Sequence, residues 1–309
     1  MNSSYDWGID ELVIRLRDLR VHSLEARHRL NKPPKLPVRK ELQAVVEGLS
    51  AVLFPNRLGQ PDINDEGIDY FVGYTLDTVL RKLQQQIVRE LHFTAEQTSG
   101  DISDIEIRAN DIIRTFARQL PEIRRLLDTD ITAAYQGDPA AYSVDEALVC
   151  YPGIVAMIHH RLAHNLYSLG VPLSARMIAE QAHSATGIDI HPGAIIGKSF
   201  FIDHGTGVVI GETSIIGNNV RLYQAVTLGA KRFYKDEYGV LIKGNARHPI
   251  VEDNVVIYAG ATILGRITIG HDSTIGGNVW LTQDVPPHST ITQAQGPVSY
   301  THLTLPTIL

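Results

Sequence analysis

The sequence predicts an α+β protein in which an N-terminal helical bundle is followed by a parallel β-helix of hexapeptide repeats. Two observations indicate this fold. Apolar residues follow a helical period through roughly the first 185 residues, and from Ile188 onward they recur every six residues instead. The chain has 309 residues, of which 44% are hydrophobic, so both parts can be supplied with a core.

The helical part, predicted over residues 1–186, is marked by apolar stripes separated by prolines. One stripe runs from Ile9 to Leu19, and similar stripes occur near residues 40–53, 66–93 and 104–127. The prolines at 55, 61, 121 and 139 fall between these stretches, where residues that break helices are expected. Pro152 and Pro172 then open two further helices, predicted to end near Leu169 and Ala185.

The six-residue period predicts the β-helix over residues 187–289. Each repeat has one aliphatic residue and, four positions later, a residue that is usually small or β-branched. The aliphatic positions are Ile190, Ile196, Ile202, Ile210, Ile216, Leu222, Leu228, Val251, Ile257, Ile263, Ile269, Ile275 and Leu281. Three repeats would close one triangular coil, since the intervening Gly and Asn residues tolerate the positive φ of tight corners. Residues 230–249 interrupt the period and predict an excursion loop, and residues 290–309 predict a C-terminal tail.

Composition excludes several classes of function. The net charge is −6 and no basic face stands out, which argues against nucleic acid as a partner. The N-terminus lacks the apolar core of a signal peptide and no apolar run reaches the length of a membrane span, so we expect a cytoplasmic protein without a membrane partner. The single cysteine, Cys150, excludes an internal disulfide and a cysteine zinc cluster, and its setting in EALVCYPG predicts a buried thiol.

An acid and an imidazole, Asp203 and His204, interrupt the aliphatic repeats in the stretch FFIDHGTGVVIGETSIIG. A solvated pair in a loop is the ordinary interpretation. Asp189, however, precedes His204 by 15 residues, close to the length of one coil, so stacking could bring its carboxylate near the imidazole. A carboxylate that accepts from one ring nitrogen supports the charge the ring gains when the other takes a proton. His204 and Asp189 are therefore predicted to form a general-base dyad.

Seven segments resemble a known family, the hexapeptide-repeat acyltransferases with a left-handed β-helix, and within it the serine O-acetyltransferases. They are GDPAA at 137–141, HHRLAHNLYSLG at 159–170, GIDIHPGAIIG at 187–197, DHGTGVVIGET at 203–213, VTLGA at 226–230, RHP at 247–249 and VPPHS at 285–289. The resemblance implies a left-handed helix and direct transfer of acetyl from acetyl-CoA to the hydroxyl of L-serine, the first step of cysteine biosynthesis. It also implies a homotrimer, with the helical half joining two trimers into a hexamer.

The resemblance also implies roles for individual residues. His204 would be the general base and Asp189 would orient it, while Asp138 and Asp203 would hold the substrate ammonium. Arg247 suits a bidentate grip on the substrate carboxylate. His248 would bind serine or polarise the carbonyl oxygen. The plainer interpretations are a turn residue for Asp138, before Pro139, and a solvated loop charge for Arg247.

Coenzyme A is expected in a groove beside Gly229, Gly260 and Ala261, small residues that would admit its pantetheine arm but would equally suit coil corners. Lys231, Arg232 and Lys243, in the excursion loop, could meet its phosphates or be merely solvated. A covalent nucleophile is not supported, because Cys150 lies outside the repeats and the motif G-x-S-x-G does not occur.

Two other enzymes share the predicted fold. One is a hexapeptide acetyltransferase that acts on a sugar or another hydroxyl acceptor. The other is a γ-class carbonic anhydrase, in which zinc would be held by histidines drawn from His191, His204, His248, His271 and His288, although that family's spacing is not evident here. The helix at 159–170 carries His159, His160 and His164, an arrangement that can bind metal, but packing or interface roles are expected. We expect no metal.

The resemblance makes cysteine synthase a candidate partner, because many relatives end in a segment whose terminal isoleucine docks into that enzyme. Here the chain ends VSYTHLTLPTIL, with Ile308 followed by Leu309. This ending matches neither the repeats nor such a tail, so residues 290–309 are a candidate for sequence that is not native to the protein. L-Cysteine is expected to compete with serine, since its ammonium and carboxylate would meet the same groups.

Overall fold

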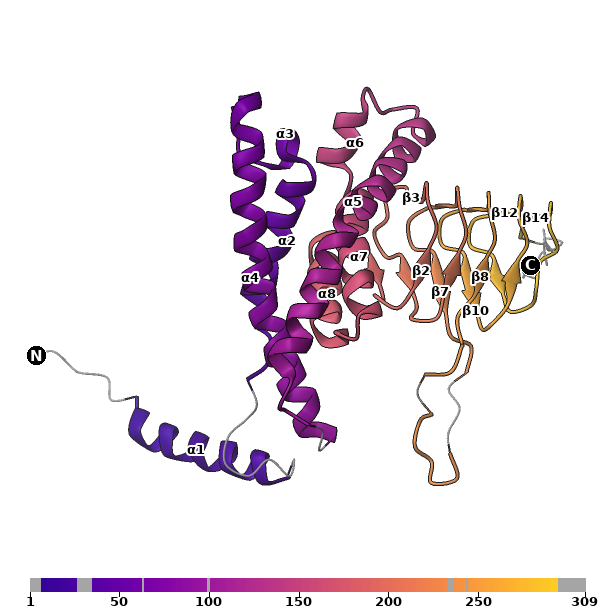
Figure 1. Ribbon diagram of the computed structural model, residues 1–309. Helices are drawn as coiled ribbons and strands as arrows, with labels where there is room; N and C mark the ends of the chain where they lie inside the picture. Colours follow the sequence, from indigo (N-terminus) through magenta and orange to yellow (C-terminus); the bar gives the residue numbers. More distant parts are fainter. Residues whose placement is uncertain are drawn as a thin grey trace, which may run out of the picture.

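The computed structural model describes residues 7–26, 35–62, 64–98, 101–232, 236–242 and 244–293 (Figure 1). Lys243 and the terminal segment from residue 294 lie outside the described residues, so the predictions that concern them stay predictions. Within the described residues, no helix is both long enough and apolar enough to cross a membrane.

The first part of the chain is helical. Its helices are α1 (Ile9–Ala26), α2 (Arg39–Leu53), α3 (Pro55–Leu58), α4 (Asp65–Thr98), α5 (Ile105–Gly137), α6 (Val144–Cys150), α7 (Pro152–Ser168) and α8 (Pro172–Thr186). Helix α1 lies apart from the others in Figure 1, and its apolar stripe, including Leu12 and Leu16, is exposed. The remaining helices pack on one another around a shared apolar core.

Two details of the helical prediction were wrong. Pro121 does not end a helix, because α5 continues through it from Ile105 to Gly137. Buried side chains on both sides of the proline, among them Phe116 and Leu127, fix the two halves of α5 against its neighbours, and this packing outweighs the missing backbone hydrogen bond. Cys150 is exposed and not buried, because it falls at the end of the short helix α6.

The second part forms triangular coils of short parallel strands, which make three sheets. The first contains β1 (Asp189–Ile190), β4 (Val209–Ile210), β7 (Thr227–Gly229), β10 (Thr262–Leu264) and β13 (Trp280–Leu281). The second contains β2 (Ile195–Ile196), β5 (Ile215–Ile216), β8 (Ile250–Val251) and β11 (Thr268–Ile269). The third contains β3 (Phe201–Ile202), β6 (Arg221–Leu222), β9 (Val256–Ile257), β12 (Thr274–Ile275) and β14 (Thr290–Ile291). The register stacks the repeated aliphatic residues, as in Ile190↔Ile210↔Leu228, and buries them inside the coils.

Three corners separate the sheets, and we name them A, B and C. Corner A follows the first sheet and contains residues 191–194, 211–214, 247–249 and 265–267. Corner B follows the second and contains residues 197–200, 217–220, 252–255, 270–273 and 286–289. Corner C follows the third and contains residues 203–208, 223–226, 258–261 and 276–279. The described parts of the segment 230–249 extend away from the coils near corner A (Figure 1).

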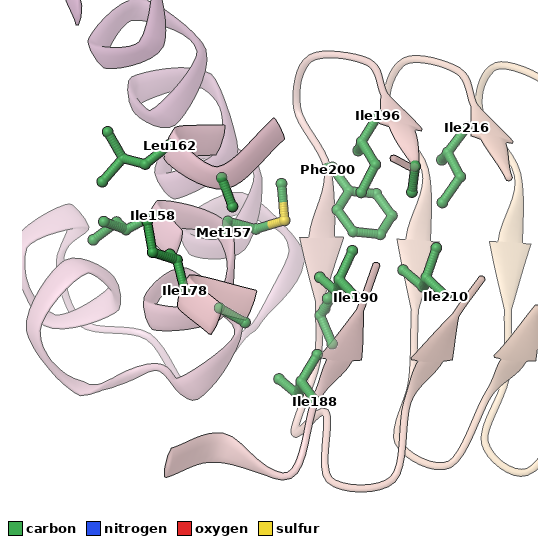
Figure 2. Close-up of a cluster of buried hydrophobic side chains, with 14 of the residues drawn as sticks. Met157, Ile158, Leu162, Ile178, Ile188, Ile190, Ile196, Phe200, Ile210 and Ile216 are labelled. Atoms are coloured by element: carbon green, nitrogen blue, oxygen red, sulfur yellow. The ribbon is translucent and has the colours of Figure 1, made fainter. Parts of the chain in front are cut away.

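The helical part closes one end of the β-helix. Met157 of α7 and Ile178 of α8 face Ile190 and Phe200 of the first coil (Figure 2), and all four belong to one continuous core. The polar edge of that coil is satisfied by Arg161 of α7, which donates to the carbonyls of Ile196 and Gly197 at 2.6 Å each. Its guanidinium is bound by the buried carboxylate of Asp130. This junction fixes α5 and α7 against corner B and the neighbouring strand β3.

Candidate active site

Corner C gathers the predicted base and both predicted ammonium ligands. Asp203 and His204 follow β3, and the imidazole Nε2 lies 3.8 Å from Asp203 Oδ1. His204 has a left-handed backbone (φ 57°), and its side chain is 73% exposed. Asp138 caps the C-terminus of α5, where its carboxylate accepts from the Tyr151 hydroxyl at 2.6 Å and from the Ala140 amide at 2.8 Å. The base therefore points to solvent beside two carboxylates.

The electrostatics of this corner favour a bound cation. The hydrogen bond from Tyr151 lowers the pKa of Asp138, and the Ala140 amide and the charges of Arg221 and His204 act in the same direction. The same bond raises the pKa of Tyr151 to about 12, so the phenol stays a donor. Asp138 is thus an oriented, ionised carboxylate at neutral pH and can accept hydrogen bonds from an ammonium group.

Sequence reasoning missed Arg221, whose side chain reaches the same corner from β6. Its Nη2 lies 2.6 Å from Asp203 Oδ2, and its guanidinium carbon lies 5.0 Å from the ring centre of Phe201 and 4.6 Å from that of Tyr223. The two rings and the carboxylate fix the side chain. Arg221 pairs with Phe201 of the preceding coil, and its side chain reaches from there to the Asp203 carboxylate two residues further along β3 and its turn.

Corner A holds the predicted carboxylate ligand. The Arg247 guanidinium is bound by Glu212 at 2.6 Å, and Glu212 also accepts from the Tyr167 hydroxyl of α7 at 3.0 Å. Arg266 donates to the carbonyls of Thr213 and His248 at 2.6 and 3.0 Å, which ties the segment around Arg247 to the coils. Glu212, Tyr167 and Arg266 were missed, although Glu212 lies within the quoted segment DHGTGVVIGET.

The hydrogen bonds of His248 decide its tautomer. Its Nδ1 lies 3.0 Å from the Thr213 amide and 2.9 Å from the Thr213 hydroxyl, and that hydroxyl oxygen already accepts from the amides of Arg247 and His248. Nδ1 is therefore an acceptor, and the ring proton is on Nε2. Burial, with the charge of Arg247 next in importance, lowers the pKa of His248 to about 4. At neutral pH this imidazole is a neutral donor.

Asp189 begins β1, and the structure describes its surroundings on the side of α8. One of its carboxylate oxygens lies within 4.8 Å of ligand atoms of Glu180 and His183 from α8. Within the part of the chain that the structure describes, no hydrogen bond or ion pair joins Asp189 to His204. The dyad therefore stays a prediction.

The three small residues expected beside coenzyme A lie at opposite ends of the strands of the first sheet. Gly229 ends β7 and pairs with Leu264, whereas Gly260 and Ala261 belong to corner C, just before β10. The Ala261 side chain is fully buried in the coil, so only its backbone can face a ligand. Gly260 has a φ of 73°, which favours glycine.

A basic cavity of about 410 Å³ adjoins corner A. It is lined by Lys231, Arg232, Arg247 and Arg266 together with Leu264, Gly265 and Thr282. Four guanidinium or ammonium groups around one cavity suit a phosphorylated ligand.

The five histidines singled out for a zinc centre do not form a three-histidine site in the described residues, although His271 and His288 contact each other. Within the described residues, the groups of His, Cys, Asp and Glu that could hold a metal are His271–Asp272–His288 and Glu180–His183–Asp189, and neither contains three histidines. The α7 histidines pack instead. His160 is buried, and His159 and His164 have Nδ1 atoms 2.8 and 2.9 Å from the carbonyls of Val155 and Pro192.

Comparison with known proteins first defines the class. A model of the bacterial transferase hexapeptide family (six repeats) matches residues 248–283. Together with the triangular coils of parallel strands, this match defines a hexapeptide-repeat transferase with a left-handed β-helix.

The particular family follows from full-length similarity. A protein of Synechococcus elongatus named "Serine acetyltransferase, plasmid" is 56% identical over 292 residues, which are 94% of this chain and 92% of that protein. The chain therefore belongs to the serine acetyltransferase family. Among solved structures, Entamoeba histolytica serine acetyltransferase isoform 3 in complex with cysteine is similar, with a TM-score of 0.71, 38% identity and coverage of 88% of this chain and 86% of that chain. The Neisseria gonorrhoeae serine acetyltransferase in complex with serine has a TM-score of 0.53, 28% identity and coverage of 82% and 95%.

Proposed function

We propose that this protein transfers the acetyl group of acetyl-CoA to the hydroxyl of L-serine, which gives O-acetyl-L-serine and CoA. The observation that carries the proposal is that two clusters of polar residues lie on the coils. The cluster at corner C has an exposed imidazole beside two carboxylates, and the cluster at corner A has an arginine beside a neutral histidine donor. An amino-acid substrate that reacts at its hydroxyl needs a base for that hydroxyl, carboxylates for its ammonium and an arginine for its carboxylate. The family to which the chain belongs supports serine as that amino acid and acetyl-CoA as the donor.

In the proposed mechanism, His204 removes the serine hydroxyl proton as the oxygen attacks the thioester carbonyl carbon. The carbon–sulfur bond then breaks, and the imidazolium returns its proton to the departing CoA thiolate. Such general-base assistance is worth about 10²- to 10⁴-fold in rate. Asp189 would orient the imidazole, and the carboxylates of Asp138 and Asp203 would hold the serine ammonium. No acyl-enzyme and no metal enter this mechanism.

Arg247 and His248 would complete the substrate site. The Arg247 guanidinium would bind the serine carboxylate, since Glu212 takes up only part of its donor set. His248 would donate from Nε2 to the same carboxylate or to the developing oxyanion, as its tautomer permits.

The two halves of this site would come from neighbouring subunits. Corners C and A lie at opposite edges of the first sheet, and within the described residues no hydrogen bond or ion pair joins a side chain of the His204 group to one of the Arg247 group. A homotrimer would place corner C of one β-helix against corner A of the next. Coenzyme A would lie along this junction, near Gly229, Gly260 and the backbone of Ala261, with its phosphates at the basic cavity of Lys231 and Arg232.

Larger assembly and cellular context are also proposed. The helical part, residues 1–186, would join two trimers into a hexamer, while residues 187–289 would carry catalysis in the cytoplasm. Cysteine synthase would bind through residues 290–309 only if that segment is native. L-Cysteine would compete with serine, as the cysteine complex of the Entamoeba relative supports. Inhibition that leaves the apparent KM for serine unchanged would contradict this last proposal.

The test of the proposed activity is thiol release from acetyl-CoA with and without L-serine, for the wild type and His204→Ala. We expect release that depends on serine and falls about 10²- to 10⁴-fold in the variant. A sugar acceptor in place of serine serves as the comparison. Release that is indifferent to serine, or to loss of the imidazole in a folded variant, would contradict the proposal.

A further inference from the structure

A cluster of two histidines and one aspartate lies at corner B, away from both halves of the proposed active site. His271 and Asp272 follow β11, and His288 belongs to the turn one coil later, just before β14. The two turns stack directly, since the His288 amide donates to the His271 carbonyl at 2.8 Å. All three side chains are accessible from solvent, with exposed fractions of 46%, 40% and 70%.

The backbone of corner B explains why these side chains converge. Asp272 and His288 occupy equivalent positions of successive coils and have the same left-handed backbone, with φ of 58° and 56°. Stacked coils lie about 4.8 Å apart. Side chains at equivalent positions therefore project in the same direction, and the rings of His271 and His288 meet edge to face with centres 4.8 Å apart.

The ligand atoms have spacings suited to a metal ion. Asp272 Oδ2 lies 2.7 Å from His271 Nδ1 and 3.6 Å from His288 Nδ1, and one ligand atom from each residue lies within 4.8 Å of the other two. Around a tetrahedral zinc ion, with bonds of about 2.0–2.1 Å, neighbouring ligand atoms are about 3.3 Å apart. The two separations from Asp272 lie on both sides of this value, so each differs from the tetrahedral spacing by less than an ångström.

We propose that His271, Asp272 and His288 bind one divalent transition-metal ion. Two imidazoles and one carboxylate favour zinc, nickel or copper over magnesium and calcium, which prefer oxygen ligands. The ion would replace the hydrogen that joins His271 to Asp272, and solvent would supply the fourth ligand. Asn254 Nδ2 donates to the other carboxylate oxygen of Asp272 at 2.9 Å, and this hydrogen bond orients the carboxylate toward the ion.

The surroundings distinguish this cluster from the second candidate group. Glu180, of the group Glu180–His183–Asp189, is already paired with the Arg176 guanidinium at 2.8 Å, and Asp189 belongs to the proposed catalytic machinery. At corner B, by contrast, none of the hydrogen bonds and ion pairs of His271, Asp272 and His288 in the described residues involves a lysine or arginine. The bound ion would join the terminal coil to the coil before it.

The test is zinc titration of the full chain by calorimetry after treatment with a chelator. We expect the wild type to bind one zinc ion per chain. The affinity for zinc should fall at least ten-fold in His271→Ala and in His288→Ala, and by a smaller factor in Asp272→Asn. His92→Ala removes an exposed histidine of α4 and should titrate as the wild type does. Wild-type titrations for both corner B variants, or loss of the tight site in His183→Ala instead, would overturn the proposal.

Hydrogen exchange provides a second readout, which depends on the position of the ion. Zinc should slow exchange at residues 286–291 in the wild type and not in His288→Ala. The serine-dependent activity of folded His288→Ala should stay unchanged without added metal, so a failure here is separable from a failure of the proposed enzyme function. Zinc that slows exchange equally in both proteins would contradict a site at corner B.

Discussion

At the residue scale, His248 shows how one turn decides what an imidazole can do. The amide and hydroxyl of Thr213 both point at Nδ1, and Arg247 and Arg266 place positive charge nearby. A ring in this position resists protonation and presents Nε2–H. His204, exposed beside two carboxylates, is left as the base of the proposed reaction.

The lowered pKa of His248 predicts a dependence of stability on pH. The folded pKa of about 4 lies below the ordinary 6.5, so between these values the folded state binds fewer protons than the unfolded state. The contribution of His248 is complete above about pH 6.5 and is lost as the pH falls toward 4. His248→Gln should therefore flatten the free energy of unfolding over this range, as measured by denaturant unfolding at several pH values. All other ionisable groups are the same in both proteins, so parallel curves would show that His248 is not the cause.

The sequence pointed to candidate site residues that interrupt the repeats or lie in segments resembling the family. It missed the residues that contact them. Asp203 and His204 stand out because a polar pair interrupts an aliphatic wall. Arg221 was overlooked because a single arginine in a strand looks like a solvated side chain until its pairing with Phe201 and its bond to Asp203 are known. Tyr167 stands in the segment HHRLAHNLYSLG, but its contact with Glu212 could not be found from local sequence, since α7 reaches Glu212 only through the packing of the helical part on the coils.

At the element scale, the tight turn before Glu212 must be free of side chains. A Cβ added to Gly211 would overlap the imidazole of His248, although the glycine backbone itself is ordinary. Gly211→Ala should displace the ring and lower serine-dependent turnover by roughly 10²-fold, because small misplacements of reacting groups have effects of that size. Gly73→Ala, on α4 with open space around the new Cβ, is the matched control and should retain full activity. Full activity of Gly211→Ala would mean that the position of His248 does not matter.

The junction of the helical part with the first coil rests on a buried ion pair. Arg161→Met would leave the Asp130 carboxylate buried without its partner and two coil carbonyls without their donor. We expect a loss of about 3–5 kcal/mol in the free energy of unfolding, as is usual when one member of a buried pair is removed. Arg81→Met breaks the exposed pair with Asp77 and should change stability little. Equal effects of the two substitutions in denaturant titrations would contradict this role for Arg161.

The period of six predicted the coils well, because each aliphatic position has the same burial requirement in every turn. The strands themselves are only two or three residues long, so their pairing is fixed by stacking and not by propensity. Helix α5 is the opposite case. Its proline predicted a break, and long-range packing of residues on either side overrode the local signal.

At the scale of the whole molecule, the triangular cross-section accounts for the two separate polar clusters, at corners A and C, on which the proposed function rests. Successive turns at one corner stack, so residues a coil apart gather there, whereas residues at different corners stay separated by a sheet. In the proposed function, a catalytic centre that uses both corners would be shared between copies of the chain. The zinc cluster proposed at corner B needs only one corner and would form in a single chain.

Complementation between two inactive variants tests the shared site most directly. His204→Ala and His248→Ala would each be purified, measured alone, then mixed under conditions that dissociate and reassemble the subunits. If each site combines His204 of one subunit with His248 of its neighbour, a random mixture of equal parts should regain about one quarter of wild-type activity, since half of the subunits supply each intact residue in a symmetric trimer. Mixtures that stay as inactive as the separate variants, although subunit exchange is demonstrated, would contradict a site formed between subunits.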